Sequence, residues 1–151
     1  MRMLIRSRGT AASAVLAAAL SVGAVGLAQP ALAATPTCNN TTTMLNVVLP
    51  AHNGDIFCGM SRGAHSAAVG SLQQTLNICY WSGSVTRGHL STFGTRLVED
   101  NDFGGKTKAA LMSAQASAGA AVDGEYGPET RGTILFPTDT ASGLRCQVFG
   151  R

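Results

Sequence analysis

A nine-residue segment occurs twice in this chain, and it restricts the fold more than any other feature. Residues 100–108 read DNDFGGKTK and residues 123–131 read DGEYGPETR, so the two align without a gap at a 23-residue offset. Asp, Gly and Thr are kept, and four other positions exchange like for like, as Asn/Gly, Asp/Glu, Phe/Tyr and Lys/Arg. Because a unit this short cannot bury a core of its own, the repeat predicts two similar turn-and-helix units packed against each other.

Each copy contains the residues of a turn that leads into a helix. Asn101 and Gly124 are residue types that accept a positive φ at little cost, so we expect the chain to turn there. The aromatic residue that follows can fix the turn to the core. Gly104 and Gly127 suit a helix N-cap, and Pro128 stands at a first helical position, where its missing N–H is harmless. Two helix starts are therefore predicted.

Residues 1–33 have the pattern of a secretory signal peptide. Arg2, Arg6 and Arg8 precede an uncharged run of Ala, Val, Leu and Gly, which ends in a small-x-small cleavage site at residues 31–33. An uncleaved membrane anchor is the alternative, because the run is close to the lower length limit for a spanning helix. We expect cleavage, no membrane attachment afterwards, and a location outside the cell or in the cell wall.

Removal of this segment changes the charge balance. The 11 Lys and Arg of the chain include three arginines of the signal, so eight remain against 8 Asp and Glu. Nucleic-acid binding driven by charge needs clustered Lys and Arg, so we expect no nucleic-acid partner. The remaining length suits one domain, and we expect a monomer.

All four cysteines follow the cleavage site, at Cys38, Cys58, Cys79 and Cys146. An exported chain meets an oxidising compartment, so two disulfides are expected. Three pairings are possible, and the sequence alone does not choose between them. We prefer Cys38–Cys58, which ties the N-terminal segment to itself, and Cys79–Cys146, which ties the first helix to the C-terminal tail. Chain-entropy arguments give about 3 and 4 kcal/mol for loops of those sizes.

The segment after the signal divides into three parts. Residues 34–62 are an N-terminal extension, in which the β-favouring run 43–49 and the dipeptide Asn53-Gly54 favour a small hairpin. Residues 63–136 are a helical domain. Residues 137–151 are a tail, which we expect to be held only through its cysteine.

Three helices are predicted in the helical domain. Residues 66–80 form the first, because Val69, Leu72, Leu76 and Cys79 fall on one face. The second follows the first repeated turn, and the third covers residues 128–136. Residues 82–98 contain three glycines and no sustained period, so they are predicted to be a long loop.

These motifs in this order resemble the three-helix peptidoglycan-binding domains that accompany many bacterial cell-wall hydrolases. The resemblance covers roughly residues 63–135. It rests on Val69-x-x-Leu72-Gln73-x-x-Leu76, the Asp-x-x-Phe-Gly-x-x-Thr turn ending at Thr107, Ala110-Leu111-x-x-x-Gln115-x-x-x-Gly119, and the segment from Val122 to Thr130. The four-cysteine layout is similar to small secreted actinobacterial members. The resemblance implies a mainly α, compact three-helix fold that binds peptidoglycan by its glycan or its stem peptide. The stretch between Tyr80 and Asp100 is longer than the family's usual connection.

Eight residues are candidate ligand-binding residues, each with a structural alternative. The glutamine amides can meet a peptide ligand or bond loop backbone. Acidic and hydroxyl groups beside turns can bond a ligand or their own backbone. A cation in the third helix can meet a carboxylate or solvent, and the paired aromatic residues can stack on a sugar or anchor the core. The candidates are Gln73, Gln115, Asp123, Tyr126, Thr130, Arg131, Tyr80 and Trp81.

The chain shows no catalytic motif. His52, His65 and His89 are spread over three segments without the spacing of a zinc site. No serine lies in a Gly-x-Ser-x-Gly elbow, and neither repeated turn has the ligand order of a calcium-binding EF-hand. We therefore expect no enzyme activity, no metal and no cofactor.

The leading functional hypothesis is a secreted, non-catalytic module that recognises bacterial cell-wall peptidoglycan. One alternative is a secreted proteinaceous inhibitor of a hydrolase, because size, export and disulfides fit it equally well. That alternative needs a rigid, disulfide-flanked reactive loop, and residues 82–98 contain no cysteine. A second alternative is an accessory subunit of a cell-wall hydrolase.

Overall fold

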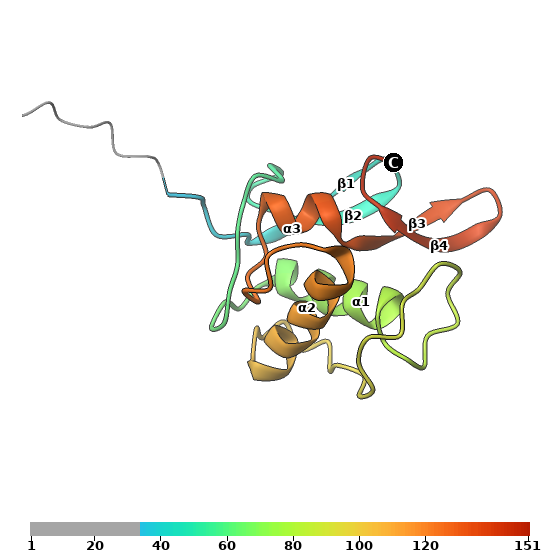
Figure 1. The fold of residues 1–151 in the computed structure, drawn as a ribbon. Helices are drawn as coiled ribbons and strands as arrows, with labels where there is room; N and C mark the ends of the chain where they lie inside the picture. Colours follow the sequence, from blue (N-terminus) through green and yellow to red (C-terminus); the bar gives the residue numbers. More distant parts are fainter. Residues whose placement is uncertain (1–33) are drawn as a thin grey trace, which may run out of the picture. The chain divides into compact units, whose positions relative to one another are not determined.

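The computed structural model describes residues 34–151, and Figure 1 shows how their elements are arranged. In chain order the elements are β1 (Asn40–Met44), β2 (Val47–Ala51), α1 (Ala67–Cys79), α2 (Gly105–Ala118), α3 (Pro128–Thr133), β3 (Leu135–Thr140) and β4 (Gly143–Val148). The four strands form one antiparallel sheet in the order β1-β2-β3-β4, and α1 packs against β2 and β3. No helix of the described segment is long and apolar enough to span a membrane. The predicted signal peptide lies outside the described residues.

The prediction of a mainly α, three-helix fold is wrong. Three helices are present in the described segment, but the extension and the tail also fold, into two hairpins that join as one sheet. The two hairpins meet at a single register pair, Val47 of β2 and Thr138 of β3. The tail is therefore held by backbone pairing along β3 and β4 as well as by Cys146. The protein is an α+β structure.

The third helix is shorter than predicted because a strand begins inside the predicted range. α3 ends at Thr133, and Ile134 already has extended backbone at φ −77° and ψ 159°. Ile134, Phe136 and Thr138 are buried while the residues between them are partly exposed, which is the period of a strand. Pro137 also disfavours helical backbone at the residue before it. The alternation of buried and partly exposed residues, with a period of two, is the pattern that indicates a strand here.

The small hairpin of the extension is present, but its turn differs from the predicted one. β1 and β2 are joined by Leu45 and Asn46, which have φ values of 51° and 60°. Two-residue turns of this kind need positive φ at both central positions. Asn53-Gly54 makes a second tight turn, between His52 and Asp55, whose backbone groups bond to each other.

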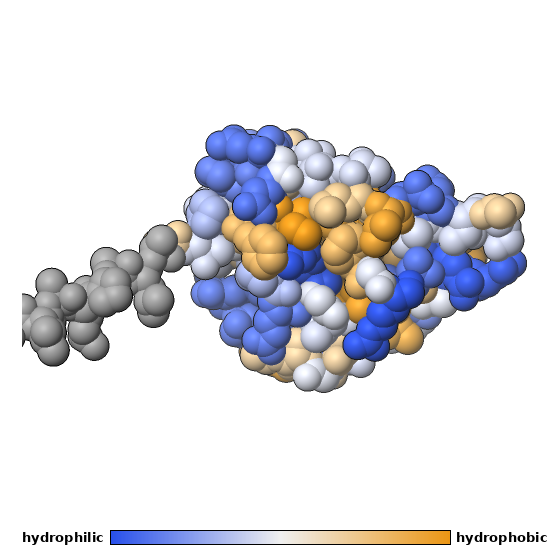
Figure 2. Space-filling model, turned by 90° about the horizontal axis from the view of Figure 1, so that it is seen from above, coloured by the Kyte–Doolittle hydropathy of each residue, from blue (hydrophilic) through white to orange (hydrophobic). Residues whose placement is uncertain are grey.

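The core lies between α1, the sheet and the repeated turns. Its fully buried side chains include Leu49 of β2, Leu72 and Leu76 of α1, Leu111 of α2 and Phe136 of β3. The predicted apolar face of the first helix is thus confirmed. On the face seen from above in Figure 2, apolar residues gather in the middle and hydrophilic residues lie around them.

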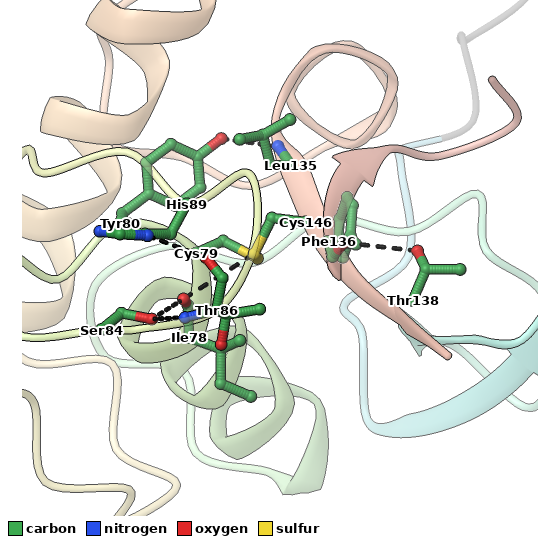
Figure 3. The surroundings of a disulfide bond; sticks show 10 residues. All are labelled: Ile78, Cys79, Tyr80, Ser84, Thr86, His89, Leu135, Phe136, Thr138 and Cys146. Carbon is green, nitrogen blue, oxygen red and sulfur yellow. Dashed lines mark hydrogen bonds between the residues drawn. A yellow bond between two sulfur atoms is a disulfide. The ribbon is translucent and has the colours of Figure 1, made fainter. Parts of the chain in front are cut away.

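Both predicted disulfides are present, Cys38–Cys58 and Cys79–Cys146. Figure 3 shows that the second joins the end of α1 to β4. Beside it, the buried hydroxyl of Tyr80 accepts a hydrogen bond from the backbone N–H of Leu135 at 2.6 Å. The C-terminal hairpin is therefore fixed to α1 by a covalent bond and by a polar contact.

Candidate ligand-binding groove

The second repeated turn is organised around the side-chain amide of Gln115. Its Nε2 donates to Asp123 Oδ1 at 2.8 Å, to the carbonyl oxygen of Glu125 at 3.0 Å and to Thr130 Oγ1 at 3.0 Å. Its Oε1 accepts from the backbone N–H of Gly124 at 2.9 Å. The side chain is 0% exposed, so every polar group of this glutamine is engaged inside the protein.

The first repeated turn has the same arrangement around Gln73. Its Nε2 donates to Asp100 Oδ1 at 2.7 Å, to the carbonyl oxygen of Asp102 at 3.0 Å and to Thr107 Oγ1 at 3.1 Å. Its Oε1 accepts from the backbone N–H of Asn101 at 3.1 Å. Both glutamines, and Thr130 with them, are therefore placed to hold their turns rather than to meet solvent.

Each turn also contains one exposed aspartate that bonds its own loop. The backbone N–H of Glu125 and the amide of Gln115 lower the pKa of Asp123. The Gln73 amide and the backbone N–H of Asp102 lower the pKa of Asp100 in the same way. Hydrogen bonds to a carboxylate favour its charged form, so both stay ionised and keep the turns closed.

Arg131 and Tyr126 are also directed inward. Arg131 is 8% exposed, donates through Nη1 to the carbonyl oxygen of Ile56, and lies 5.0 Å from the ring centroid of Phe57. It thereby attaches the extension to α3. Tyr126 is buried, burial raises the pKa of its phenol, and its hydroxyl has no hydrogen-bond partner.

The two aromatic candidates make contacts within the protein. Tyr80 is fully buried, and burial raises the pKa of its phenol to about 12. Trp81 is half-buried and donates through Nε1 to the carbonyl oxygen of Gly94 at 3.1 Å. The guanidinium of Arg96 lies 5.9 Å from its ring centroid, and Gly83 packs so closely against the ring that a side chain there would collide with it.

A groove of about 430 Å³ lies between the long loop and α2. This volume is in the usual range of small-molecule sites. The loop contributes Phe93, Gly94, Thr95 and Leu97, and the helix contributes Lys106, Ala109, Ala110 and Ser113. The floor is therefore apolar and made largely of small side chains, and Lys106 is the one charged residue of the lining.

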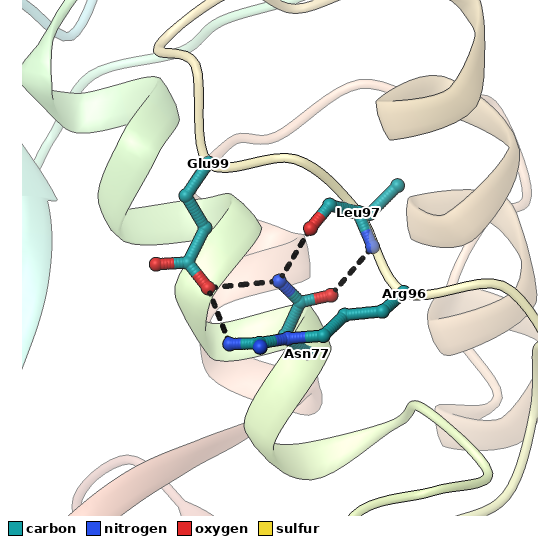
Figure 4. Close-up of polar contacts among 4 residues, drawn as sticks. All are labelled: Asn77, Arg96, Leu97 and Glu99. Carbon is teal, nitrogen blue, oxygen red and sulfur yellow. Dashed lines mark hydrogen bonds and ion pairs between the residues drawn. The ribbon is translucent and has the colours of Figure 1, made fainter.

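Asn77 of α1 holds the loop that forms one wall of this groove. Its Nδ2 donates to the carbonyl oxygen of Leu97 at 3.0 Å and to Glu99 Oε1 at 2.9 Å, and its Oδ1 accepts from the N–H of Leu97 at 2.8 Å. Figure 4 shows these bonds and the ion pair of Glu99 with Arg96, at 3.3 Å. Asn77, which is only 3% exposed, thus positions Leu97 against the groove.

The groove adjoins one of two small hollows, which lie beside the two repeated turns. Their volumes are about 260 and 250 Å³. Seven lining residues of the first correspond to seven of the second at the same 23-residue offset. The first set is Val98, Asp100, Asp102, Gly104, Gly105, Lys106 and Thr107, and the second is Ala121, Asp123, Glu125, Gly127, Pro128, Glu129 and Thr130.

Lys106 and Glu129 are the one pair of equivalent residues in these hollows that carry opposite charges. Glu129 stands in the first turn of α3, where the helix dipole favours a negative charge. Lys106 stands in the equivalent place of α2, where a positive charge is disfavoured by about 0.3–1 kcal/mol. Lys106 lines both the first hollow and the groove. The two copies thus differ in charge at the residue that reaches the groove.

Residues 65–134 match the model of a family described as putative peptidoglycan binding domain. The segment is thus similar to that family. No curated protein and no solved structure shows a significant match to the chain. The matched segment contains the three helices of the described residues and both repeated turns, whereas the four strands lie outside it. The boundaries 63–136 that the sequence suggested stay a prediction.

The structure brings the predicted ligand residues to two separate places in the matched segment. Six of them, Gln73, Gln115, Asp123, Tyr126, Thr130 and Arg131, surround the repeated turns, while Tyr80 and Trp81 anchor the base of the long loop. No predicted ligand residue lines the groove.

Sequence reasoning missed Leu97, Lys106 and Asn77. Of these three residues, only Lys106 could have been singled out from the sequence, because its charge is opposite to that of its counterpart in the repeat, Glu129. Among residues 34–151, no three His, Cys, Asp or Glu side chains gather as a metal site.

Proposed function

We propose that this protein is a secreted, non-catalytic module that attaches to bacterial peptidoglycan. The observation that carries the proposal is the family match over residues 65–134. The two closed turns support it, because they give the helices of this domain a fixed arrangement. The two disulfides support export, because such bonds persist in oxidising compartments.

We place the contact surface of this module in the groove between the long loop and α2. The groove is concave and largely apolar, with one free cation at its edge, which is the usual composition of a ligand site. The predicted residues of the repeated turns are less suited to direct contact, because their polar groups are used internally. Their role in the proposal is to hold α2, which forms one wall.

The test is cosedimentation of the purified protein with insoluble peptidoglycan freed of teichoic acid, with chitin as a control. We expect the protein in the peptidoglycan pellet and in the supernatant with chitin. Protein that stays in the supernatant with peptidoglycan contradicts the proposal. A zymogram on cell-wall gels tests the non-catalytic part, since a clearing band from the purified protein would show a hydrolase.

The inhibitor alternative receives no specific support from the loop. Residues 82–98 are fastened to α1 through Asn77 and through backbone bonds of Leu90 to Cys79 and of Thr92 to Tyr80. A reactive loop has to project into the active site of a hydrolase, whereas these bonds attach this loop to α1 at several points.

A further inference from the structure

The groove offers a ligand a surface of mainly short apolar groups. Leu97, Ala109 and Ala110 present short apolar groups, and Phe93 is the one aromatic residue in the lining. Short apolar groups complement small side chains such as the methyl group of alanine, because burial of apolar area stabilises a complex in proportion to that area. Aliphatic and methyl surface therefore dominates the floor.

The aromatic residues near the groove determine how well it can hold the sugar chain of peptidoglycan. Recognition of a sugar ring by stacking needs an aromatic face that is open to solvent. Tyr80 is fully buried, and the ring of Trp81 is already in contact with Arg96 and Gly83. Tyr80 and Trp81 are thus unsuited to stacking on a sugar. Phe93 is the one aromatic ring in the lining, and a single ring among short aliphatic groups matches a peptide better than a sugar chain.

Lys106 gives the groove a positive charge. Lys106 lies at the edge of the groove, and the one ion pair within the described part of the chain joins Arg96 to Glu99 instead. Its ammonium group thus has no carboxylate partner in residues 34–151 and stands where the helix dipole disfavours it. Residues that break a local rule are expected at functional sites. A carboxylate is the ligand group that complements this charge.

The two sides of Lys106 differ in charge. On the other side of Lys106, the first hollow is lined by Asp100 and Asp102. The lowered pKa of Asp100 keeps this group ionised near neutral pH. A ligand carboxylate is repelled from that hollow and is favoured on the groove side of Lys106, where the remaining lining is uncharged.

We propose that the groove binds the carboxyl-terminal end of a peptidoglycan stem peptide, with its small side chains on Leu97, Ala109 and Ala110 and its terminal carboxylate at the Lys106 ammonium. The inference rests on the proposed function, because it names the part of peptidoglycan that this site recognises. The loop wall supplied by Leu97 belongs to the long connection of this chain, so the site depends on that loop as well as on α2.

Isothermal titration of the purified protein with three soluble probes tests the inference. The probes are a stem tetrapeptide that ends in alanine with a free carboxylate, the same peptide with an amidated end, and a glycan strand from which the peptides have been removed. We expect saturable binding of the free acid, binding of the amide weaker by about tenfold or more, and no binding of the glycan.

A pair of matched variants tests the role of the cation. The Lys106→Gln variant should bind the free acid and the amide with equal affinity, because it lacks the positive charge that favours the free acid. Glu129→Gln changes charge at the equivalent position of the other copy and should behave as the wild type. Both positions are exposed, so neither substitution should disrupt the fold. Thermal unfolding of both variants checks this.

The outcomes separate the inference from the proposed function. Binding to insoluble peptidoglycan together with preference for the glycan probe, equal binding of acid and amide by the wild type, or no binding of the free-acid peptide overturns the inference alone. Failure to bind insoluble peptidoglycan overturns the proposed function. Retained discrimination by Lys106→Gln also overturns the inference, because another group would then read the carboxylate.

Discussion

The two repeated turns have the same internal bonds but different surroundings. In each, a glutamine amide bonds an aspartate, a backbone carbonyl group and a threonine, at distances that agree within about 0.1 Å. The aspartate lies 27 residues from its glutamine in the first copy and 8 residues away in the second. The longer connection forms a wall of the groove in the first copy.

This difference separates residues that maintain the fold from residues that can bind. What the copies share is a closed turn, and each shared residue has a sufficient role inside it. What the copies do not share is the long loop and the exchange of Glu129 for Lys106. Both of these features lie at the groove. Ligand recognition is therefore expected where the copies differ.

The largest expected effect is loss of either glutamine. Gln73→Ala and Gln115→Ala each remove four hydrogen bonds of a turn and leave the backbone N–H of Asn101 or Gly124 without its acceptor, so each should lower the free energy of unfolding by about 2–4 kcal/mol. Denaturant unfolding measures this. A variant with unchanged stability and reduced peptidoglycan binding would instead make its glutamine a ligand residue.

The two copies carry different aromatic residues, and replacing each by the other should change the free energy of unfolding in opposite directions. The unpartnered hydroxyl of Tyr126 is buried, whereas its counterpart Phe103 has no hydroxyl. Tyr126→Phe should therefore raise the free energy of unfolding by about 1 kcal/mol, and Phe103→Tyr should lower it by about 1–3 kcal/mol. Equal shifts in the same direction, measured by denaturant unfolding, would contradict this reading of the copies.

Acid should weaken both turns in the same pH range. Because the folded-state pKa values of Asp100 and Asp123 are lowered, their contribution is complete above the ordinary aspartate pKa of about 4 and is lost as the pH falls below it. Both carboxylates are exposed, so the loss is modest. Thermal midpoints from pH 6 to pH 2 should fall less steeply in the double variant Asp100→Asn, Asp123→Asn than in the wild type. An equally steep fall would show that other groups carry the acid sensitivity.

The smallest expected effect on stability comes from making the first copy resemble the second. Lys106→Glu replaces an unfavourable charge in the first turn of α2 with a favourable one, so it should stabilise the protein by about 0.5 kcal/mol. The same change should weaken binding of a carboxylate ligand. A variant that is more stable and binds as well as the wild type would remove Lys106 from the site.

Local features of the chain could be predicted from the sequence. Asn101 and Gly124 have φ values of 64° and 68°, as the repeat predicted, and Pro128 begins α3. These features depend on the conformational preferences of single residues, which a sequence displays directly. The disulfide pairing was also preferred correctly, although the sequence left three pairings open.

Features that depend on distant residues could not be predicted in this way. The sheet requires Val47 and Thr138 to meet, and neither residue carries a local signal for the other. The groove requires Asn77 to hold Leu97 beside α2, and the partners of Asn77 became apparent only in three dimensions. Gln73 and Gln115 were recognised as equivalent, but their burial and their bonds were decided by the packing of the turns around them.

The most direct test of the account compares two alanine-to-phenylalanine variants of α2 in cosedimentation with peptidoglycan. Ala109 lines the groove, whereas Ala116 lies on the same exposed side of the helix beyond the lining residues. The account predicts that Ala109→Phe fills the groove and lowers retention about tenfold or more, with an unchanged thermal midpoint, and that Ala116→Phe is retained like the wild type. Full retention of Ala109→Phe would contradict the assignment of binding to the groove.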